Sequence, residues 1–477
     1  MLPFGEMGRE WVENGSDAML LGEVFQPFIQ RSPVAVMVQG ILERVFDDEK
    51  LEELFRKHAV LQYTKELTFA QCVHVMSDVV FQRSSSVGAW HKTHQDEVPV
   101  TRQALYDKLK HTDLPVPVAL VQYAGRELFA CCQALRVRPR TLLAGYRLRI
   151  LDGNHLAGTE HRIRELRPHR AAALPGQALV YYDPQYDRIT DVFPCEDAHA
   201  QERLLLAEVL ERIAAGECVL ADRNFCTTGF VFGLARRRAF FILRQHASTL
   251  SWQLEGERRY VGTDTQGRRI YEQAIRLTDP TTGETLLVRR ITIELLQPTK
   301  RGEMEIHILT NVPAQEADAR KIADLYGDRW TIEKAFWHLS QELQSEIDTR
   351  GYPKAALFGF CVALTAYNVV ALVKGAIAAA WGHSFVREEL SMYYLTVEVE
   401  RVTDGMQIAV GPDDWAIFRT MTAEQFAETL RTVAAQMNLC KYTKSKRGPK
   451  KKPPPKISGK RNHHVSTARI LAMRKKK

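Results

Sequence analysis

The sequence lacks the paired cysteines and histidines that mark a zinc site or a disulfide framework. None of its eight cysteines forms a Cys-X-X-Cys pair or has histidine partners at zinc spacing. Most lie in apolar segments, where a free cysteine behaves as a small hydrophobic side chain. We therefore expect a protein of a reducing, cytoplasmic compartment without structural disulfides.

Long apolar runs are also scarce. The first 15 residues carry acidic side chains and no apolar stretch, so we expect no secretory leader. Residues 355–373 are apolar enough to resemble a membrane span, but they include Thr365, Tyr367 and Asn368, and the segment stands alone. The segment predicts a buried core helix and no membrane partner, with a membrane protein as the weaker alternative.

Acidic residues are absent from the last part of the chain. Residues 441–477 hold 15 Lys and Arg and no Asp or Glu, so the other 440 residues carry a net charge of −7 out of the overall +8. This segment has too little apolar surface to fold, and it predicts a disordered basic tail that neutralises DNA phosphates. A solubility tail or a localisation signal is the alternative.

The remaining residues alternate between helical and strand periodicity. Residues 146–243 contain apolar runs in the order β-β-β-α-β-α-β, which predicts an α/β fold with a mixed sheet and helices against it. The strand-like segments that follow predict an all-β insertion. The helical N-terminal region either binds DNA or has a packing role. The expected regions are 1–140 (helical), 141–249 (first part of the α/β core), 250–312 (β-strand insertion), 313–400 (second part of the core), 401–440 (helical) and 441–477 (basic tail).

Three carboxylates stand out against this pattern. Asp152 lies in a predicted Asp-Gly-Asn turn after the first strand, Asp222 directly follows the apolar strand 218–221, and Glu333 lies on a helix after the insertion. Singly, they have ordinary explanations as a turn former, a helix cap and a solvated helix residue. Carboxylates without thiolate or imidazole partners are the ligands that Mg²⁺ and Mn²⁺ prefer. We predict that all three are catalytic and hold two such ions, which serve phosphoryl displacement.

The helix that carries Glu333 predicts a polar face. Tyr326, Arg329, Glu333 and Ser340 are separated by three, four and seven residues, which places them on one narrow side of a single long helix. Such a face, flanked by aromatic side chains, is typical of a helix that closes an active site.

Three segments resemble the motif blocks of DDE insertion-sequence transposases. They are LDGNHLAGTEHR around Asp152, VLADRNFCT around Asp222, and YGDRWTIEKAFWHLSQEL around Glu333. The third block is similar to that of the subgroup with a Tyr-Arg-Glu-Lys signature (the insertion-sequence-four type), because Tyr326, Arg329 and Glu333 match its spacing. The resemblance covers about residues 145–375 and the tail segment NHHVSTARIL.

The resemblance implies an RNase H-like catalytic core with a β-strand insertion. It also implies cleavage at the ends of a mobile element and strand transfer to target DNA, with two Mg²⁺ or Mn²⁺ ions. The implied partners are double-stranded DNA with terminal inverted repeats, target DNA and a second copy of the chain, in the cytoplasm at the nucleoid. Tyr326, Arg329, Arg223 and Ser340 are the residues expected to contact DNA phosphates.

Two positions depart from the subgroup pattern. Ser340 stands where the signature has Lys, and Ile306 stands about where some members have a Trp that stacks on a flipped base. Trp252 is better explained as a packed side chain of the β-insertion, so the sequence does not support a hairpin route of excision. Two other functions remain open: a nuclease of the same fold that cleaves without joining, and an inactive, DNA-binding descendant, which the presence of all three carboxylates disfavours.

Overall fold

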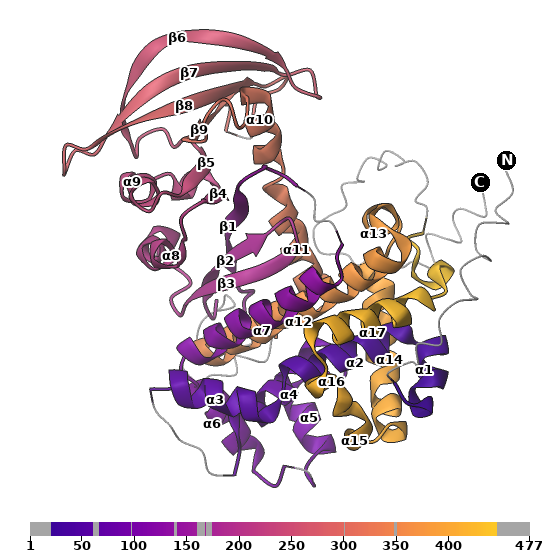
Figure 1. The fold of residues 1–477 in the computed structure, drawn as a ribbon. Coiled ribbons are helices and arrows are strands. Elements are labelled where there is room, and N and C mark those ends of the chain that lie inside the picture. Colours follow the sequence, from indigo (N-terminus) through magenta and orange to yellow (C-terminus); the bar gives the residue numbers. More distant parts are fainter. Residues whose placement is uncertain are drawn as a thin grey trace, which may run out of the picture.

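The computed structural model describes most of the chain. The described residues are 21–60, 66–96, 98–137, 141–159, 167, 174–299, 301–347 and 351–445. The basic tail was predicted at residues 441–477; residues 441–445 are described, and the predicted disorder of 446–477 lies outside the described residues. Figure 1 shows a bundle of helices at one end of the molecule and a long, curved sheet at the other.

The N-terminal region is helical, as predicted. Several of its helices begin at side chains that accept a hydrogen bond from the first turn, for example Thr101, whose hydroxyl accepts from Ala104 N at 3.2 Å. The helices of this region are η1 (Glu23–Phe25), α1 (Gln26–Arg31), α2 (Pro33–Val45), α3 (Asp48–His58), α4 (Phe69–Val80), α5 (Val87–Thr93), α6 (Arg102–His111) and α7 (Pro115–Ala134).

The nine described strands form one mixed sheet in the order β3-β2-β1-β4-β5-β9-β8-β7-β6. Strands β1 to β3 form an antiparallel meander, whereas β1, β4 and β5 run parallel. The strands are β1 (Arg147–His155), β2 (Gln177–Asp183), β3 (Arg188–Cys195), β4 (Glu217–Ala221), β5 (Phe240–Arg244), β6 (Ser251–Thr263), β7 (Arg269–Thr278), β8 (Thr285–Glu294) and β9 (Glu305–Thr310). The predicted β-β-β-α-β-α-β order and the mixed sheet are confirmed.

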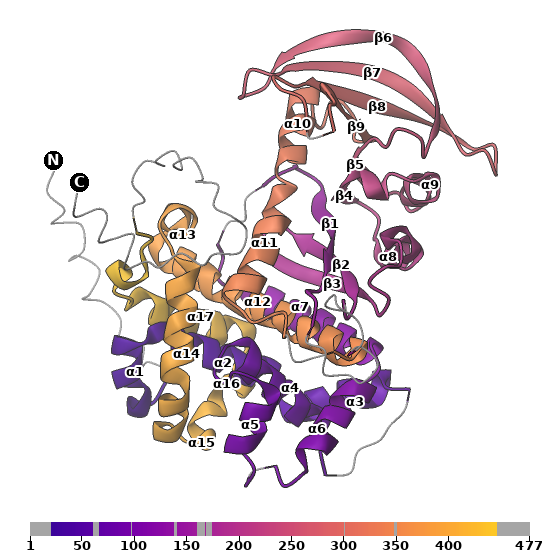
Figure 2. The same cartoon turned by 180° about the vertical axis from the view of Figure 1, so that it is seen from behind.

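Helices cover both faces of the sheet. One face packs on α8 (Leu206–Arg212), which follows the short helix η3 (Glu202–Leu205), and on α9 (Thr228–Arg236). The other face packs on α7 and on the helices that follow the sheet, among them α11 (Trp330–Gln341), which crosses it in Figure 2. Because side chains alternate along a strand, each strand contributes to both cores.

The predicted β-insertion is present, and it belongs to the central sheet. Strand β9 pairs with β5 on one side and with β8 on the other, so β6 to β9 extend the core sheet edge-on. We call these four strands the sheet extension. Figure 1 shows it curving over α10 (Ala319–Gly327), which packs against it.

The single long helix predicted through Tyr326 and Ser340 is wrong. Helix α10 ends at Gly327, a turn follows at Asp328 and Arg329, and α11 begins at Trp330. The two helices have different partners, because α10 packs on the sheet extension whereas α11 packs on β1. Tyr326 and Glu333 therefore belong to different helices.

The apolar segment at 355–373 lies in α12 (Pro353–Trp381), and its prediction as a core helix is confirmed. Among the described residues it is the one helix long and apolar enough to cross a membrane, and 94% of its most apolar stretch is buried in the protein. The helices packed around it include both N-terminal and C-terminal ones. The C-terminal helices are α13 (His383–Glu388), α14 (Met392–Ala409), α15 (Pro412–Trp415), α16 (Ile417–Thr420), α17 (Ala423–Ala435) and η5 (Leu439–Tyr442).

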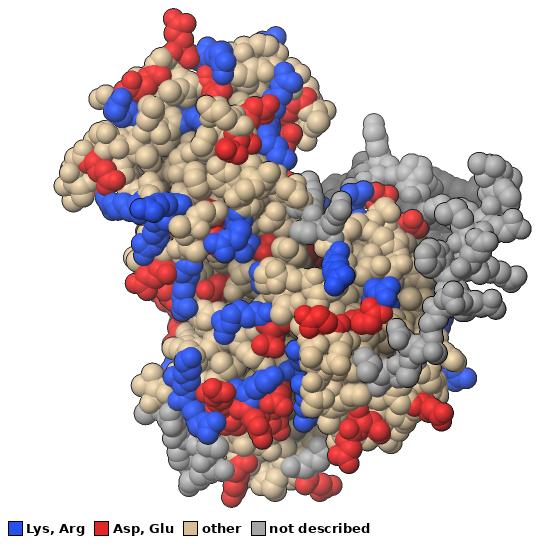
Figure 3. Space-filling model, in the orientation of Figure 1, with Lys and Arg blue, Asp and Glu red and all other residues tan. Residues whose placement is uncertain are grey.

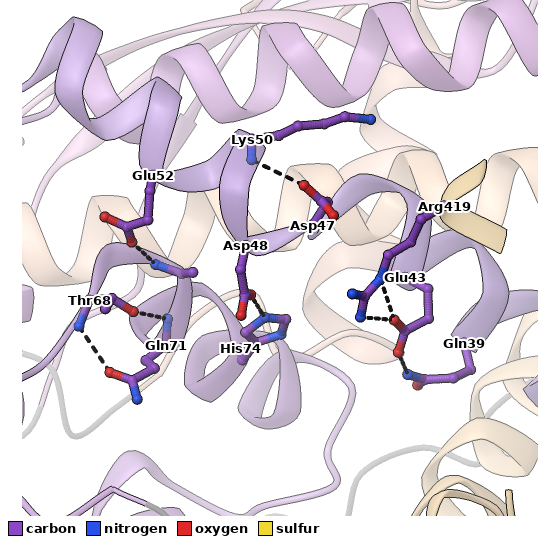
Figure 4. A network of polar contacts seen from close by, with 11 residues as sticks. Gln39, Glu43, Asp47, Asp48, Lys50, Glu52, Thr68, Gln71, His74 and Arg419 are labelled. Carbon is purple, nitrogen blue, oxygen red and sulfur yellow. Dashed lines mark hydrogen bonds and ion pairs between the residues drawn. The ribbon is translucent and has the colours of Figure 1, made fainter. Parts of the chain in front are cut away.

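Polar contacts join helices of the N-terminal region to helices of the C-terminal region within this bundle. Arg419 of α16 donates two hydrogen bonds to Glu43 of α2, at 3.1 and 2.6 Å, and Gln39 donates to the same carboxylate (Figure 4). Tyr442, inside the segment predicted to be tail, is buried and donates to Glu398. The described chain is therefore folded at least through Tyr442.

Candidate active site

The sheet places Asp152 and Asp222 side by side. The last parallel pair between β1 and β4 is Leu151 with Ala221. Asp152 is the next residue of β1, and Asp222 is the residue directly after the end of β4. Neighbouring strands are about 4.8 Å apart, so these positions adjoin. Ile150 and Leu220, two residues earlier, belong to the core under α11, and the alternation of side chains directs both aspartates to the same side.

The prediction of a turn at Asp152 is wrong in detail. Strand β1 continues through His155, and Asp152 pairs with Val180 of β2. The antiparallel pairing with β2 continues where the parallel pairing with β4 has ended. Asp152 is therefore held on rigid strand backbone, and its own carboxylate accepts a hydrogen bond from Gly153 N at 3.1 Å.

A single guanidinium connects Glu333 to Asp152. Arg329, at the start of α11, donates from Nη1 to Asp152 Oδ2 and from Nη2 to Glu333 Oε1, both at 3.1 Å. Arg329 is only 8% exposed, so these charge-assisted bonds are shielded from water. Arg329 lies in the turn between α10 and α11, and from there its guanidinium reaches Asp152 on β1.

The electrostatics of the site are those of three carboxylates around the positively charged side chain of Arg329. Burial raises the pKa of Asp152 to about 6; Arg329 opposes the rise, and the charges of Glu333 and Asp222 add to it. Burial works against the charge of Arg329, yet Asp152, Asp222 and Glu333 together raise its pKa above the ordinary value. Asp222 and Glu333 therefore both lie within electrostatic reach of Asp152 and of Arg329.

The predicted phosphate-contacting residues are distributed around this centre. Tyr326 is 9% exposed and lies beside Arg329, and burial together with Asp222 raises its pKa to about 12. Arg223 follows Asp222 in the short helix η4 (Arg223–Phe225), where its backbone N–H donates to Asp222 Oδ1 at 2.6 Å. Ser340 is exposed, lies about 10 Å further along α11 than Glu333, and donates its hydroxyl hydrogen to Trp337 O at 3.1 Å.

The structure adds residues that the sequence did not single out. Glu202 lies so close to Gly153 that a Cβ there would come within 2.0 Å of its Oε1, and it lies within electrostatic reach of Asp222. Arg244 ends β5 and lies within electrostatic reach of Tyr326. Gly153, directly after Asp152, was the one signal in the sequence for this contact. A glycine often marks a position where another group approaches the backbone closely.

The donor chemistry fits a hard divalent cation. Asp152, Asp222 and Glu333 offer only carboxylate oxygens, and their mutual repulsion is the kind that a bound cation relieves. Within the described part of the chain, no three acidic, histidine or cysteine side chains converge closely enough to hold one ion.

Fold and site together define an α/β protein with an acidic centre at the carboxyl ends of adjacent parallel strands. Residues 144–369 match the family model of the transposase DDE domain. The chain therefore carries a transposase DDE domain, which confirms the family predicted from the three motif blocks. The Tyr-Arg-Glu-Lys subgroup stays a prediction.

Individual proteins give weaker similarities. Over 195 residues the chain is 29% identical to y4zB of Sinorhizobium fredii, which is named as a transposase. The alignment covers 39% of this chain and 48% of y4zB, so the chain spans about half the length of that relative. The cryo-EM structure of the piggyBac transposase synaptic complex with hairpin DNA aligns at 10% identity with a TM-score of 0.38, over 78% of this chain and 81% of that one.

Proposed function

We propose that the chain is a DNA transposase that cuts DNA at the ends of a mobile element and joins the freed ends to target DNA. The observation that carries the proposal is the pair Asp152 and Asp222 at the ends of adjacent parallel strands, with Glu333 connected to them through Arg329. The DDE domain over residues 144–369 supports the same activity. The partners that follow are double-stranded DNA with terminal inverted repeats, target DNA at the nucleoid, and a second copy of the chain that holds the other end.

The strand arrangement supports an RNase H-like core for this activity. An antiparallel meander, β3-β2-β1, continues into the parallel strands β4 and β5, and helices cover both faces. Ligands of such sheets bind beyond the carboxyl ends of the parallel strands, which is where Asp152 and Asp222 lie. The sheet extension is then an insertion between β5 and the helix that carries Glu333.

We infer that Asp152, Asp222 and Glu333 hold two Mg²⁺ or Mn²⁺ ions. Such ions, when bound, activate the attacking oxygen and stabilise the leaving oxygen of a phosphoryl displacement. The two aspartates are fixed by strand backbone, whereas Glu333 is 39% exposed on α11 and has more freedom to adjust.

Arg329 has two roles in this proposal. Its planar fork neutralises Asp152 and Glu333 in the structure, and the same fork suits two oxygens of a phosphate. Two of its five N–H groups are used in these bonds, so donors remain for the oxygens of a phosphate. Tyr326 beside it and Arg223 beside Asp222 complete the proposed phosphate contacts, and exposed Ser340 lies at the periphery.

The test is metal-dependent cleavage of DNA that carries the element ends. Asp152→Ala, Asp222→Ala and Glu333→Ala should each lower cleavage by at least about a thousandfold, because each removes an ion ligand, and should leave DNA binding largely intact. Substantial Mg²⁺-dependent cleavage by Asp222→Ala would overturn the assignment. Joined products from a labelled DNA end distinguish a transposase from a nuclease that only cleaves.

A further inference from the structure

A cluster of arginines lies beside the acidic centre, at the active-site end of the sheet. Arg223 follows β4 and Arg244 ends β5, so both are placed by neighbouring parallel strands. The pKa of His246, in the next loop, is lowered by burial and by the charges of Arg203, Arg223 and Arg301. Positive charge is therefore concentrated at this end of the sheet.

One carboxylate lies between two of these arginines. Glu303 Oε1 accepts from Arg223 Nη1 at 3.4 Å, and Glu303 Oε2 accepts from Arg244 Nη2 at 2.6 Å. Thr299 also donates to Glu303 Oε2, at 3.1 Å. Burial raises the pKa of Glu303, but Thr299 and the two arginines outweigh it and hold the pKa below its ordinary value. Glu303 is therefore an ionised bridge between the two arginines at neutral pH.

The two sides of this bridge differ in rigidity. Arg223 and Arg244 are 17% and 18% exposed and extend from the core sheet, whereas Glu303 is 38% exposed and lies on the loop between β8 and β9. A carboxylate on an exposed loop can turn into solvent while the two guanidinium groups stay in place. The pair of arginines would then present donors to any other anion with suitably spaced oxygens.

We propose that Glu303 occupies the position of a DNA phosphate and is displaced from Arg223 and Arg244 when DNA binds, an inference that rests on the proposed function. Arg223 adjoins Asp222, and Arg244 lies within electrostatic reach of Tyr326. A phosphate held by both arginines would therefore be a near neighbour of the phosphate at the acidic centre. Glu303 lowers the affinity for DNA, because its ion pairs with two arginines must be broken first.

Glu303→Gln tests this directly, with Glu284→Gln as the matched control. Glu284 is 40% exposed and also accepts from one arginine, Arg236, but it lies just before β8, at the opposite end of that strand from the loop of Glu303. Both substitutions remove one negative charge, so the control cancels the effect of net charge. The measurement is fluorescence anisotropy of a labelled duplex in EDTA, over a series of KCl concentrations.

We expect Glu303→Gln to bind the duplex about three- to tenfold more tightly than Glu284→Gln does at low salt. The slope of log affinity against log salt should also be steeper, by about 0.9 for each additional phosphate that is neutralised. Glu303→Asp should stay close to the unaltered chain. Arg244→Ala combined with Glu303→Gln should abolish the gain.

Equal affinities and slopes for Glu303→Gln and Glu284→Gln would overturn the inference. If the unaltered chain then still cleaves DNA with Mg²⁺, the proposed function stands and only the role of Glu303 is lost. If the chain does not cleave DNA but Glu303→Gln still tightens binding, the proposed function fails and the bridge remains an anion site. Thermal unfolding of each variant, followed by circular dichroism, confirms that the proteins compared are folded.

Discussion

Arg329 is the residue on which the organisation of the acidic centre depends. It is buried, it donates to two carboxylates, one of which lies 177 residues away in sequence, and its Nε has no hydrogen-bond partner among the described residues. An arginine held in this way has donor capacity left, and it lies over the rigid end of a strand. Ser340 differs in every respect, because it is exposed and its hydroxyl hydrogen is donated to its own helix.

We expect Arg329→Ala to damage strand cleavage far more than Ser340→Ala does. A charge-assisted hydrogen bond contributes about 1.5–3 kcal/mol, whereas a neutral one contributes about 1 kcal/mol. Ser340→Lys should be tolerated and should tighten DNA-end binding, because it adds a cation on the exposed face of α11. Single-turnover cleavage by the three variants is the measurement, and equal damage from the two alanine substitutions would show that this division of roles is wrong.

A second residue-level prediction concerns His307 of β9. Burial lowers its pKa to about 4, and the charges of Arg290 and Arg258 act in the same direction. The folded state therefore favours the neutral ring, so the stability that His307 contributes is present above its unfolded pKa of about 6.5 and is lost as the pH falls from there toward about 4.

His307→Gln should reduce this acid sensitivity. The side chain is 28% exposed, so we expect it to account for about 1–2 kcal/mol between pH 6.5 and 4. Urea unfolding of the variant and the unaltered chain at both pH values measures the difference. Parallel losses of stability in the two proteins would contradict the assignment to His307.

At the level of elements, α12 joins the helical bundle to the sheet. Strand β3 is an edge strand, whose backbone groups need partners on the outer side. Asn368 of α12 supplies them: its Oδ1 accepts from Ile189 N at 2.7 Å, and its Nδ2 donates to Ile189 O at 2.9 Å. The amide is 2% exposed, so no water can replace it easily.

Asn368→Leu should lower the free energy of unfolding by about 2–4 kcal/mol, because it leaves one buried N–H and one buried C=O unpaired. Thr365→Val, one turn earlier on α12, is the matched control. The Thr365 hydroxyl donates only to Cys361 O of the same helix, so its removal should cost about 1 kcal/mol or less. Similar urea midpoints for the two variants would show that Asn368 does not hold the sheet edge.

For the whole molecule, the distribution of charge separates the folded part from the tail. Acidic and basic side chains are interspersed over the face shown in Figure 3, and residues 1–445 carry a net charge of −5. The last 32 residues hold 13 Lys and Arg and no acidic residue. The positive net charge of the chain therefore comes from residues 446–477.

Truncation after Ser445 keeps buried Tyr442 in place and removes this charge. We expect weaker DNA binding and a flatter salt dependence, by about 0.9 in slope for each phosphate that the tail neutralises in the unaltered chain. Cleavage of a saturating amount of DNA should change much less, because the acidic centre is untouched. An unchanged affinity and salt slope would show that the tail serves another purpose.

Several elements could be predicted from local sequence because their physics is local. Alternating or continuous apolar residues predict β1 to β5, and the apolar run of α12 predicts a buried helix. Thr101 and Thr422 are of a residue type that favours helix N-caps, and both cap helices here. The positions of Asp222 and Glu333 relative to a strand and a helix follow from the same patterns.

The break between α10 and α11 could not be predicted in this way. Both helices have the same periodicity, and Asp328 and Arg329 do not break it in sequence. The two helices differ in their partners, because α10 packs on the sheet extension and α11 on β1, and these surfaces are formed by segments distant in sequence. The edge-on union of the extension with the core sheet is likewise a matter of pairing between strands far apart in sequence.

By itself, the sequence singled out Asp152, Asp222 and Glu333 as the candidate site, because carboxylates that follow apolar strands or lie on a periodic helix are readable from residue type and spacing. Only the tertiary structure decided how they meet. The parallel register of β1 and β4 sets Asp152 beside Asp222, the Arg329 guanidinium reaches both Asp152 and Glu333, and the β8–β9 loop brings Glu303 to Arg223 and Arg244. Most of these contacts join residues separated by roughly 60 to 180 positions, and local propensity carries no information about such distances.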